Sequence, residues 1–313
     1  MQISVVIPLF NEAESLPELM AWIDSVMQTN QFSYEVIMVD DGSDDNSWEV
    51  IEVLKKSFAS LKAIRFQRNY GKSAALNEGF KAAQGDIVVT MDADLQDSPD
   101  EIPEFYKMIK EDGYHLVSGW KKKRYDNTFT KNIPSKIYNA VARKSSGIIL
   151  HDFNCGIKAY QLNVVKSIEV FGEMHRYIPI LAKWAGFKKI GEKVVVHQAR
   201  KYGTTKFGWE RFVNGFLDLM TIQFLSKFGK KPMQFFGLVG TLFFLIGFGS
   251  VGYITVSKFL YPDTSITNKP AFYIALTSML IGVQLFLAGF IAELVNRNAS
   301  DRNHYLIAEK IGW

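Results

Sequence analysis

The chain has 313 residues, of which 48% are hydrophobic and 14% aromatic, a composition that provides a substantial core and excludes a disordered protein. The formal net charge of +4 conceals an asymmetry: residues 1–120 hold nine Lys and Arg against 21 Asp and Glu, whereas the remainder holds 27 against 11. The single cysteine, Cys155, excludes an intramolecular disulfide and fits a reducing compartment. We therefore expect two electrostatically different regions, one of them a large folded domain.

The N-terminal stretch is apolar and reads "MQISVVIPLFNEAESLP". No basic residue precedes the apolar run, and Pro8 and Glu12 interrupt it early. A secretory signal peptide has a basic start and a longer apolar region. The stretch therefore predicts a buried strand.

Further apolar runs follow at short intervals, each before a helix-like segment: "YEVIMVDD", "LKAIRFQ", "GDIVVTMD" and "HLVSGW". Strands that alternate with helices indicate an α/β fold with a mostly parallel sheet covered on both faces. In such sheets, ligands bind beyond the carboxyl ends of the strands. Polar residues stand at three of these predicted ends: Asn11, Glu12, Asp40, Asp41, Asp92 and Asp94.

Two common phosphate-binding motifs are missing from the sequence. No G-x-G-x-x-G follows the first strand, and no G-x-x-x-x-G-K-[ST] occurs anywhere, so the dinucleotide and P-loop interpretations lose their main support. The segment 69–79, "NYGKSAALNEG", resembles a phosphate loop but has one glycine before its lysine. An ordinary helix start is an equal alternative.

An acidic segment, "VVTMDADLQDSPDE", spans residues 88–101. Ser98, followed by Pro99 and then by Glu101, has the pattern of a capping box with proline at the first helical position. Asp100 and Glu101 then favour a helix N-terminus and need no ligand.

Three carboxylates of this segment are left without such an explanation: Asp92, Asp94 and Asp97. Asp92 and Asp94 lie two residues apart where the strand ends, so a turn can bring them to one point. Oxygen ligands of this kind suit magnesium or manganese, which take further ligands from water and a diphosphate. Simple solvation of the loop is the alternative.

Two long uncharged stretches lie near the C-terminus, from Pro232 to Ser257 and from Pro270 to Ala292. Each exceeds the roughly 20 residues that cross a bilayer, and buried core helices are the alternative. A dozen residues separate them, so we expect a transmembrane hairpin of about residues 233–257 and 271–292. Basic residues flank both outer ends, which predicts that these ends and the N-terminal domain are cytoplasmic.

The segment before the first span is basic and amphipathic. Residues 183–231 carry 11 Lys and Arg against three Asp and Glu, and residues 208–231 place apolar side chains along one helical stripe. This pattern favours a helix in the membrane interface near anionic lipid, although a solvated basic face is the alternative.

Six ordered motifs resemble one known family: "VVIPLFNEAESL", "VDDGSDDNS", "RNYGKSAALNEG", "MDADLQDSPDEI", "HDFNCGIKAY" and "HQARKYGTTKFG". Together they resemble the inverting family 2 glycosyltransferases with the GT-A fold, and more closely the polyprenyl-phosphate glycosyltransferases such as dolichyl-phosphate mannose synthase and bactoprenol glucosyltransferase. The resemblance covers about residues 1–210. It implies a GT-A domain over 1–207, juxtamembrane helices over 208–231, a transmembrane hairpin over 232–295 and a cytoplasmic tail over 296–313.

The resemblance also implies roles for individual residues. Nucleotide-binding residues would be Pro8, Asn11, Glu12, Asp40, Asp41, Lys72 and Asp92. A Mg²⁺ or Mn²⁺ ion would be held by Asp92, Asp94 and Gln96. Catalytic residues would be Asp94 and Asp152. The acceptor phosphate and donor diphosphate would meet Arg124, Lys131, Ser135, Arg200, Thr205 and Lys206, with Lys122 or Lys123 as alternatives to the first two.

The implied reaction is metal-dependent transfer of a sugar from a nucleotide diphosphate sugar, by preference UDP-glucose or a related UDP-sugar, to polyprenyl phosphate at the cytoplasmic face of a bacterial inner membrane. GDP-mannose as donor and a non-catalytic nucleotide-sugar-binding adaptor are the alternatives. A processive synthase is disfavoured because the sequence has no Q-x-x-R-W motif. The expected partners are the donor, the lipid acceptor and the membrane, with no nucleic acid.

Two further expectations follow from the chemistry. The acceptor phosphate has a second pKa near ~6 and is already an oxyanion at neutral pH, so Asp152 would chiefly orient the acceptor or a cation. Gly237, Gly240, Gly247 and Gly249 could pack the hairpin against copies of itself to form a homo-oligomer.

Overall fold

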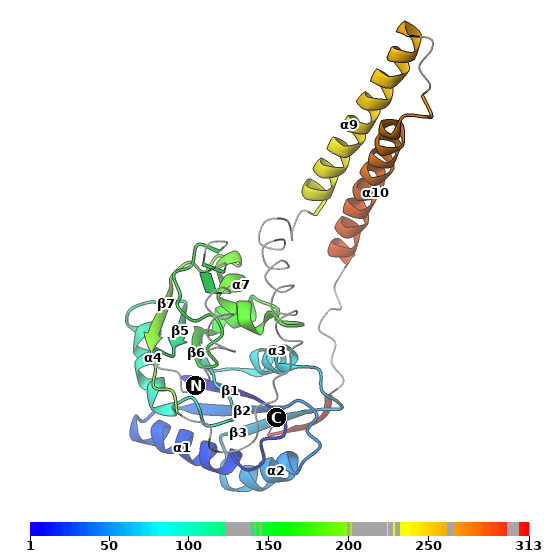
Figure 1. The fold of residues 1–313 in the computed structure, drawn as a ribbon. Helices are drawn as coiled ribbons and strands as arrows, with labels where there is room; N and C mark the ends of the chain where they lie inside the picture. The colour runs from blue at the N-terminus through cyan, green and yellow to red at the C-terminus, as the bar shows by residue number, and fades with distance from the viewer. Residues whose placement is uncertain are drawn as a thin grey trace. The chain divides into compact units, whose positions relative to one another are not determined.

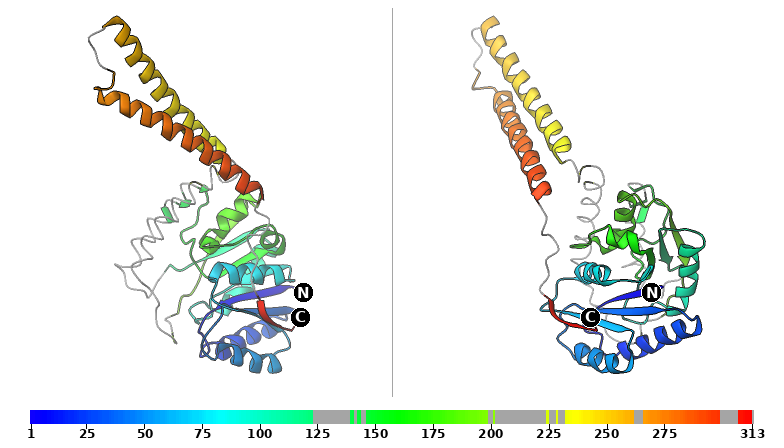
Figure 2. Two further views of the ribbon diagram at one scale, coloured as in Figure 1. Left: turned by 90° about the vertical axis from the view of Figure 1, so that its right-hand side faces the viewer. Right: turned by 180° about the vertical axis from the view of Figure 1, so that it is seen from behind.

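The computed structural model describes residues 1–122, 146–198, 232–261, 266–298 and 307–312, with a few isolated positions between them. The chain divides into two compact units (Figures 1 and 2). The first comprises Met1–Leu219 and Arg302–Trp313, and the second comprises Met220–Asp301. The N-terminal region and the end of the chain therefore belong to the same unit.

A single mixed sheet runs through the first unit, with the strand order β7-β5-β6-β4-β1-β2-β3-β8 among the described residues. The strands are β1 (Ile3–Leu9), β2 (Tyr34–Asp40), β3 (Leu61–Phe66), β4 (Ile87–Thr90), β5 (Leu116–Trp120), β6 (Lys158–Gln161), β7 (Ile190–Val194) and β8 (Ile307–Ile311). Strands β1 to β4 pair in parallel, as do β5 and β7, whereas β6 and β8 are antiparallel to their neighbours. The predicted mostly parallel α/β sheet is confirmed.

Helices cover both faces of this sheet (Figure 1). One face carries α1 (Leu16–Thr29), α2 (Ser47–Ser57) and α4 (Ile102–Lys110), and the other carries α3 (Lys72–Ala82), α6 (Leu162–Lys166) and α7 (Ile178–Trp184). Successive side chains of a strand point to opposite faces, so β1 sends Val5 and Ile7 into one core and Val6 into the other. Burial on both faces explains why β1 is apolar at every position but one.

Short 3₁₀ segments complete the unit at Pro99–Glu101 and Met174–Tyr177. The first of these begins with Ser98 as the predicted N-cap, because Ser98 Oγ accepts a hydrogen bond from the backbone N–H of Asp100 at 3.3 Å. Glu101, the other half of the predicted capping box, instead pairs with Lys193 and accepts the N–H of Val196 at 3.0 Å. This cap terminates the acidic loop and fixes where α4 begins.

The end of the chain forms an additional strand. The resemblance implies only a tail over residues 296–313, but β8 pairs with β3 in register from Ala63 with Ile311 to Phe66 with Ile307. Phe66 is the last residue of β3, so β8 begins at the carboxyl end of β3 and runs antiparallel to it. Sequence patterns did not indicate this strand, because its pairing partner lies more than 200 residues earlier.

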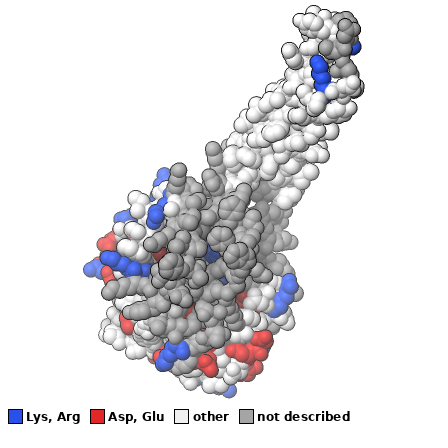
Figure 3. Space-filling view, in the orientation of Figure 1, with Lys and Arg blue, Asp and Glu red and all other residues white. Residues whose placement is uncertain are grey.

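The second unit contains two long helices, α9 (Pro232–Leu260) and α10 (Pro270–Asn298). Both are long and apolar enough to cross a membrane, and only 17% of the most apolar window of each is buried. Figure 3 shows their surface as nearly free of charged side chains apart from its tip. Extensive exposure is opposite to what a core helix would show, so the alternative of buried core helices is not supported.

Small residues pack these two helices against each other. A Cβ atom on Gly240 would lie 2.6 Å from the carbonyl oxygen of Gly282, and one on Gly247 would lie 2.5 Å from that of Ala275. Ser278 Oγ also donates a hydrogen bond to the carbonyl of Phe243 at 2.9 Å. Two of the glycines expected to join copies of the chain are therefore used inside the hairpin, which corrects that expectation for Gly240 and Gly247.

Candidate active site

The polar residues that follow β1 and β2 form an interlocked pair of loops at the carboxyl edge of the sheet. Asn11, with φ +56°, exchanges side-chain hydrogen bonds with Asp44, and its backbone N–H donates to Ser43 Oγ at 2.9 Å. Glu12 N–H donates to Ser47 Oγ at 3.0 Å. These predicted nucleotide-binding residues thus lie together, and the contacts seen here hold the loops themselves.

Asp40 ends β2 and is fully buried. One carboxylate oxygen accepts hydrogen bonds from the N–H and hydroxyl of Ser43, and the other lies 3.7 Å from Arg65 Nε without a hydrogen bond among the described residues. Burial raises the pKa of Asp40, although Ser43 opposes the change. In this structure Asp40 holds the loop after β2 and pairs with Arg65, and its predicted contact with a nucleotide stays a prediction.

Asp41 fixes the loop that precedes α3. Its two carboxylate oxygens accept the backbone N–H groups of Tyr70 and Gly71 at 2.7 and 2.9 Å. Burial raises the pKa of Asp41 to about 6, despite these two hydrogen bonds. The next residue along the chain is Lys72, the first of α3, so Asp41 determines where the Lys72 side chain starts.

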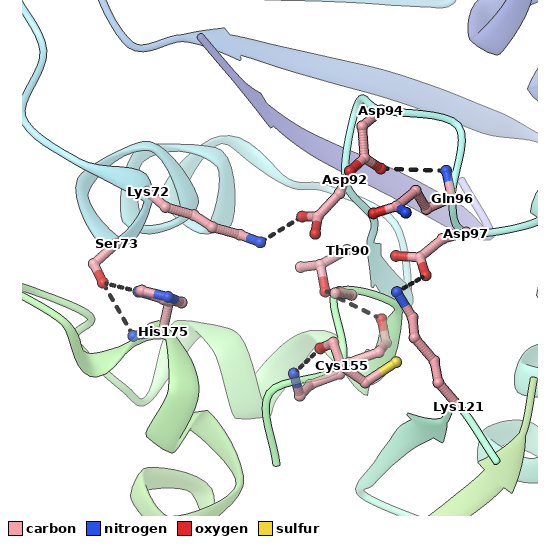
Figure 4. Close-up of polar contacts among 12 residues, drawn as sticks. Lys72, Ser73, Thr90, Asp92, Asp94, Gln96, Asp97, Lys121, Cys155 and His175 are labelled. Atoms are coloured by element: carbon pink, nitrogen blue, oxygen red, sulfur yellow. Dashed lines mark hydrogen bonds and ion pairs between the residues drawn. The ribbon is translucent and has the colours of Figure 1, made fainter. Parts of the chain in front are cut away.

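Lys72 reaches across to the acidic loop after β4 and forms an ion pair with Asp92 (Figure 4). Asp92 is about one third exposed. Burial acts to raise the pKa of Asp92, but Lys72, with smaller effects of Lys121 and Lys158, lowers it to about 2. Asp92 is therefore an anion at every physiological pH, held by a cation from another element.

Asp94 and Asp97 follow in the same loop. Leu95 between them adopts the left-handed region with φ +59°, and Asp94 Oδ1 accepts the backbone N–H of Gln96 at 3.2 Å. Asp97 is fully buried and forms an ion pair of 2.7 Å with Lys121, the residue after β5 (Figure 4). Burial acts to lower the pKa of Lys121, but Asp97 outweighs it and the pKa is raised.

Gly156 allows the carboxylates of this loop to converge. A Cβ atom there would lie 2.5 Å from Asp92 Oδ2 and 2.7 Å from Asp97 Oδ2. In the part of the chain that is described, Asp97 Oδ2 is buried without a hydrogen bond. The carboxylates of Asp92 and Asp97 therefore border the space beside the Gly156 Cα atom, which a side chain at position 156 would fill. We call this space the carboxylate cradle.

This cradle fits a small divalent cation. Within the described ranges, no three His, Cys, Asp or Glu side chains are grouped as a complete metal site. Mg²⁺ and Mn²⁺ commonly use one or two protein carboxylates and complete their coordination with water and substrate phosphate. Asp92 and Asp97 line the cradle, and Asp94 and Gln96 lie in the same loop (Figure 4). That Asp92, Asp94 and Gln96 coordinate the ion stays a prediction.

A cavity opens next to Asp92. It is lined by Pro8, Lys72, Leu76, Thr90, Met91, Asp92, Asn154, Cys155, Gly156, Lys158, Tyr160, His175 and Ile178. Of the predicted site residues, Pro8, Lys72 and Asp92 are thus brought together. Asp152 is 2% exposed and is not among the described residues that line it; its Oδ1 accepts the N–H of Asn154 at 3.1 Å.

Sequence reasoning missed two cations and a histidine near this cavity or loop. Lys121 follows the apolar run "HLVSGW" and Lys158 lies within the motif "HDFNCGIKAY", but nothing local indicated that their side chains turn toward Asp92 or Asp97. His175 had no signal in the sequence at all. Lys72 was expected among nucleotide ligands, and its pairing with Asp92 was not foreseen.

Several predicted residues lie outside the described part of the chain. They are Arg124, Lys131, Ser135, Arg200, Thr205 and Lys206, together with most of the predicted juxtamembrane helix. Lys122 is described, and its Nζ lies 5.8 Å from the centroid of the Trp120 ring. These assignments remain predictions.

Known proteins are similar to this chain in sequence and in fold. A family model described as Glycosyl transferase family 2 matches residues 4–169. The chain is 32% identical over 304 residues to a dodecaprenyl-phosphate galacturonate synthase of Rhizobium johnstonii, which covers 95% of this chain and 88% of that protein. It is 34% identical over 316 residues to an undecaprenyl-phosphate 4-deoxy-4-formamido-L-arabinose transferase of Proteus mirabilis, with 99% and 94% covered.

Solved structures share the fold. Glucosyl-3-phosphoglycerate synthase of Mycobacterium tuberculosis in complex with UDP matches with a TM-score of 0.56 at 18% identity, over 72% of this chain and 79% of that one. The same synthase with Mn²⁺, UDP-glucose and phosphoglyceric acid matches with a TM-score of 0.53 at 18% identity, over 70% and 80%. The expected GT-A fold is confirmed.

Proposed function

The chain belongs to glycosyl transferase family 2, and from this premise we propose that it transfers a sugar from a nucleotide diphosphate sugar to a polyprenyl phosphate. One observation carries the proposal. The similarity to two transferases named for polyprenyl phosphates runs through almost the whole chain, so it includes the apolar helices as well as the catalytic domain. A transferase with a soluble acceptor would not require the two apolar helices α9 and α10.

The way the chain leaves its first unit supports a lipid acceptor. Gln198 N–H donates to the carbonyl of Gln96 at 3.0 Å, and β8, which follows α10 in the chain, pairs with β3 of the same sheet. Sequence on both sides of the hairpin thus belongs to one unit, which fits an even number of membrane crossings, and the basic flanks favour the cytoplasmic side for that unit.

The donor is, in our proposal, a UDP-sugar. Structural neighbours with the same fold bind UDP and UDP-glucose, whereas the relatives are named for galacturonate and 4-deoxy-4-formamido-L-arabinose. Glucose was the first expectation from the sequence, and these names add a uronic acid and a modified pentose as candidates of equal interest.

The catalytic roles follow from charge. Asp92 and Asp94 would hold Mg²⁺ or Mn²⁺, which stabilises negative charge on the departing diphosphate. Lys72 keeps Asp92 neutralised and stands at the wall of the cavity, from which it can bind a phosphate oxygen. The acceptor phosphate needs little help from a base, so Asp152 would orient it or a neighbouring cation.

The function is tested with purified full-length protein, undecaprenyl phosphate, Mn²⁺ and a panel of radiolabelled nucleotide sugars. We expect label in the organic-extractable fraction with one UDP-sugar and none after chelation by EDTA. Label confined to the aqueous phase with every donor, or undiminished synthesis in EDTA, would overturn the proposal. A GDP-mannose donor would replace the UDP assignment alone.

Lys72 should compete with a metal ion for Asp92. We expect Lys72→Met to bind free Mn²⁺ about tenfold more tightly than the parent chain in the absence of nucleotide, because the competing ammonium is gone. UDP affinity should fall, since one cation of the cavity wall is lost. Electron paramagnetic resonance of free Mn²⁺ measures the first effect and calorimetry the second.

Lys72→Arg is the matched control, because it retains the charge and should leave Mn²⁺ affinity near that of the parent. Unchanged Mn²⁺ affinity in Lys72→Met would contradict the competition.

A further inference from the structure

A buried lysine in the cavity has more hydrogen-bond donors than partners. Lys158 is 4% exposed and lines the cavity beside Asp92. An ammonium group carries three N–H donors. Among the described residues its only hydrogen bond goes to the carbonyl of Cys155. Two donors are therefore unused at a position from which bulk water is nearly excluded.

The environment of Lys158 differs from that of the other strongly buried lysine in the domain. Lys193 is 9% exposed and forms ion pairs with Glu101 and with Glu104, the latter at 2.9 Å. No carboxylate of the described chain lies within ion-pair distance of Lys158. Burial of an ammonium without a direct ion pair is costly, which points to a ligand as the missing partner.

His175 faces the same cavity from the 3₁₀ segment before α7. Ser73 Oγ accepts the backbone N–H of His175 at 3.0 Å and lies 3.0 Å from its Nδ1 (Figure 4). The Ser73 hydroxyl can donate its own proton to Nδ1 while it accepts the backbone N–H, and we assign this arrangement, in which the ring proton lies on Nε2. The nearest carboxylate oxygen, Glu173 Oε2, lies 4.0 Å from Nδ1, beyond hydrogen-bond distance. Nε2 has no hydrogen bond within the described residues and is left as a donor.

We propose that Lys158 and His175 form an anion subsite that binds a phosphoryl group next to Asp92. The inference rests on the proposed function and extends it to two residues that the resemblance did not assign. A phosphoryl group presents several acceptor oxygens and can take N–H donors from two side chains of the cavity wall at once. Two sources supply that chemistry: the diphosphate of the donor and the monophosphate of the lipid acceptor.

Binding measurements without turnover test the subsite and identify its source. Full-length protein in detergent is titrated with inorganic pyrophosphate in the presence of Mg²⁺, and separately with farnesyl phosphate. We expect Lys158→Met to weaken one of the two by about tenfold or more, the usual effect of losing a hydrogen bond to a charged group. Weaker pyrophosphate binding assigns the subsite to the donor, and weaker farnesyl phosphate binding assigns it to the acceptor.

Thermal unfolding separates binding from folding. Methionine retains most of the lysine stem but removes the buried charge, so Lys158→Met should unfold at the same temperature as the parent or a higher one. Lys193→Met is the matched control. It leaves Glu101 and Glu104 without their ion-pair partner, so we expect a lower unfolding temperature, with the affinities for pyrophosphate and farnesyl phosphate unchanged. Unaltered affinity for both probes in Lys158→Met would overturn the subsite.

Two His175 variants give an independent readout. Glutamine places an amide nitrogen near the Nε2 position, whereas asparagine reaches only Nδ1, so His175→Gln should retain more phosphate affinity than His175→Asn. Equal affinities in the two variants and the parent would contradict the role of His175. Failure of the parent chain itself to bind either probe would instead count against the proposed function.

Discussion

Asp94→Asn should reduce turnover by about 10³-fold, the largest loss we expect from any conservative substitution in this chain. Asp94 is 7% exposed, and its carboxylate lies in the loop after β4, where it would hold the cation that stabilises the leaving diphosphate. An amide of the same shape retains an acceptor oxygen but not the negative charge. Steady-state rates with the preferred donor, and Mn²⁺ affinity measured without turnover, should fall together.

Asp152→Asn tests whether the two aspartates have different roles. Asp152 is buried and accepts the N–H of Asn154, and we expect its loss to misplace the acceptor rather than to remove charge stabilisation. The reduction should be about 10- to 100-fold, with Mn²⁺ affinity unchanged. If Asp152→Asn unfolds at the parent temperature and is as inactive as Asp94→Asn, the division of roles between them is wrong.

Gly156→Ala should weaken Mn²⁺ binding by about 100-fold and lower the free energy of unfolding by about 1–3 kcal/mol. The added methyl group would lie 2.5 Å from Asp92 Oδ2 and 2.7 Å from Asp97 Oδ2. Neither carboxylate can move freely, because Lys72 holds the first and Lys121 the second. At least one ion pair must therefore break or lengthen. Titration with Mn²⁺ and chemical denaturation measure the two effects.

Gly172→Ala provides the control for lost stability alone. Gly172 has φ +53°, and no atom lies within 4 Å of the place that a Cβ atom would take, so alanine there suffers backbone strain of about 1–2 kcal/mol and no clash. Its Mn²⁺ affinity should equal that of the parent. Normal Mn²⁺ affinity in Gly156→Ala would show that the cradle tolerates a methyl group and does not hold the cation.

Local patterns in the sequence indicated several features of the fold. The apolar runs of β1, β2 and β4 are buried on both faces, so composition alone indicated a parallel sheet. The lengths of the uncharged stretches indicated α9 and α10 in the same way. Ser98 indicated the cap before α4, because an N-cap side chain acts within a single turn. Each of these rests on forces among residues close in the chain.

The arrangement of charges around the cavity rests on forces of another kind. Lys72 and Asp92 are 20 residues apart, so no short window of sequence contains the pair with its geometry. Gly156 has no side chain, so the sequence gives no sign of a role for it. Its role appears only in the folded chain, where the carboxylates of Asp92 and Asp97 approach its Cα atom. Ser73 and His175 lie 102 residues apart and meet only where α3 approaches the 3₁₀ segment before α7.

The amino-acid sequence was sufficient for the fold class, the apolar hairpin and the aspartates of the acidic loop, because burial and turn formation are encoded in neighbouring residues. Tertiary structure alone paired β8 with β3, brought the Lys72 ammonium to the Asp92 carboxylate, and buried Lys158 without an ion pair to any residue that the structure describes. Electrostatic partners are chosen by distance in space, and a sheet with crossover connections brings together side chains that the chain itself keeps far apart.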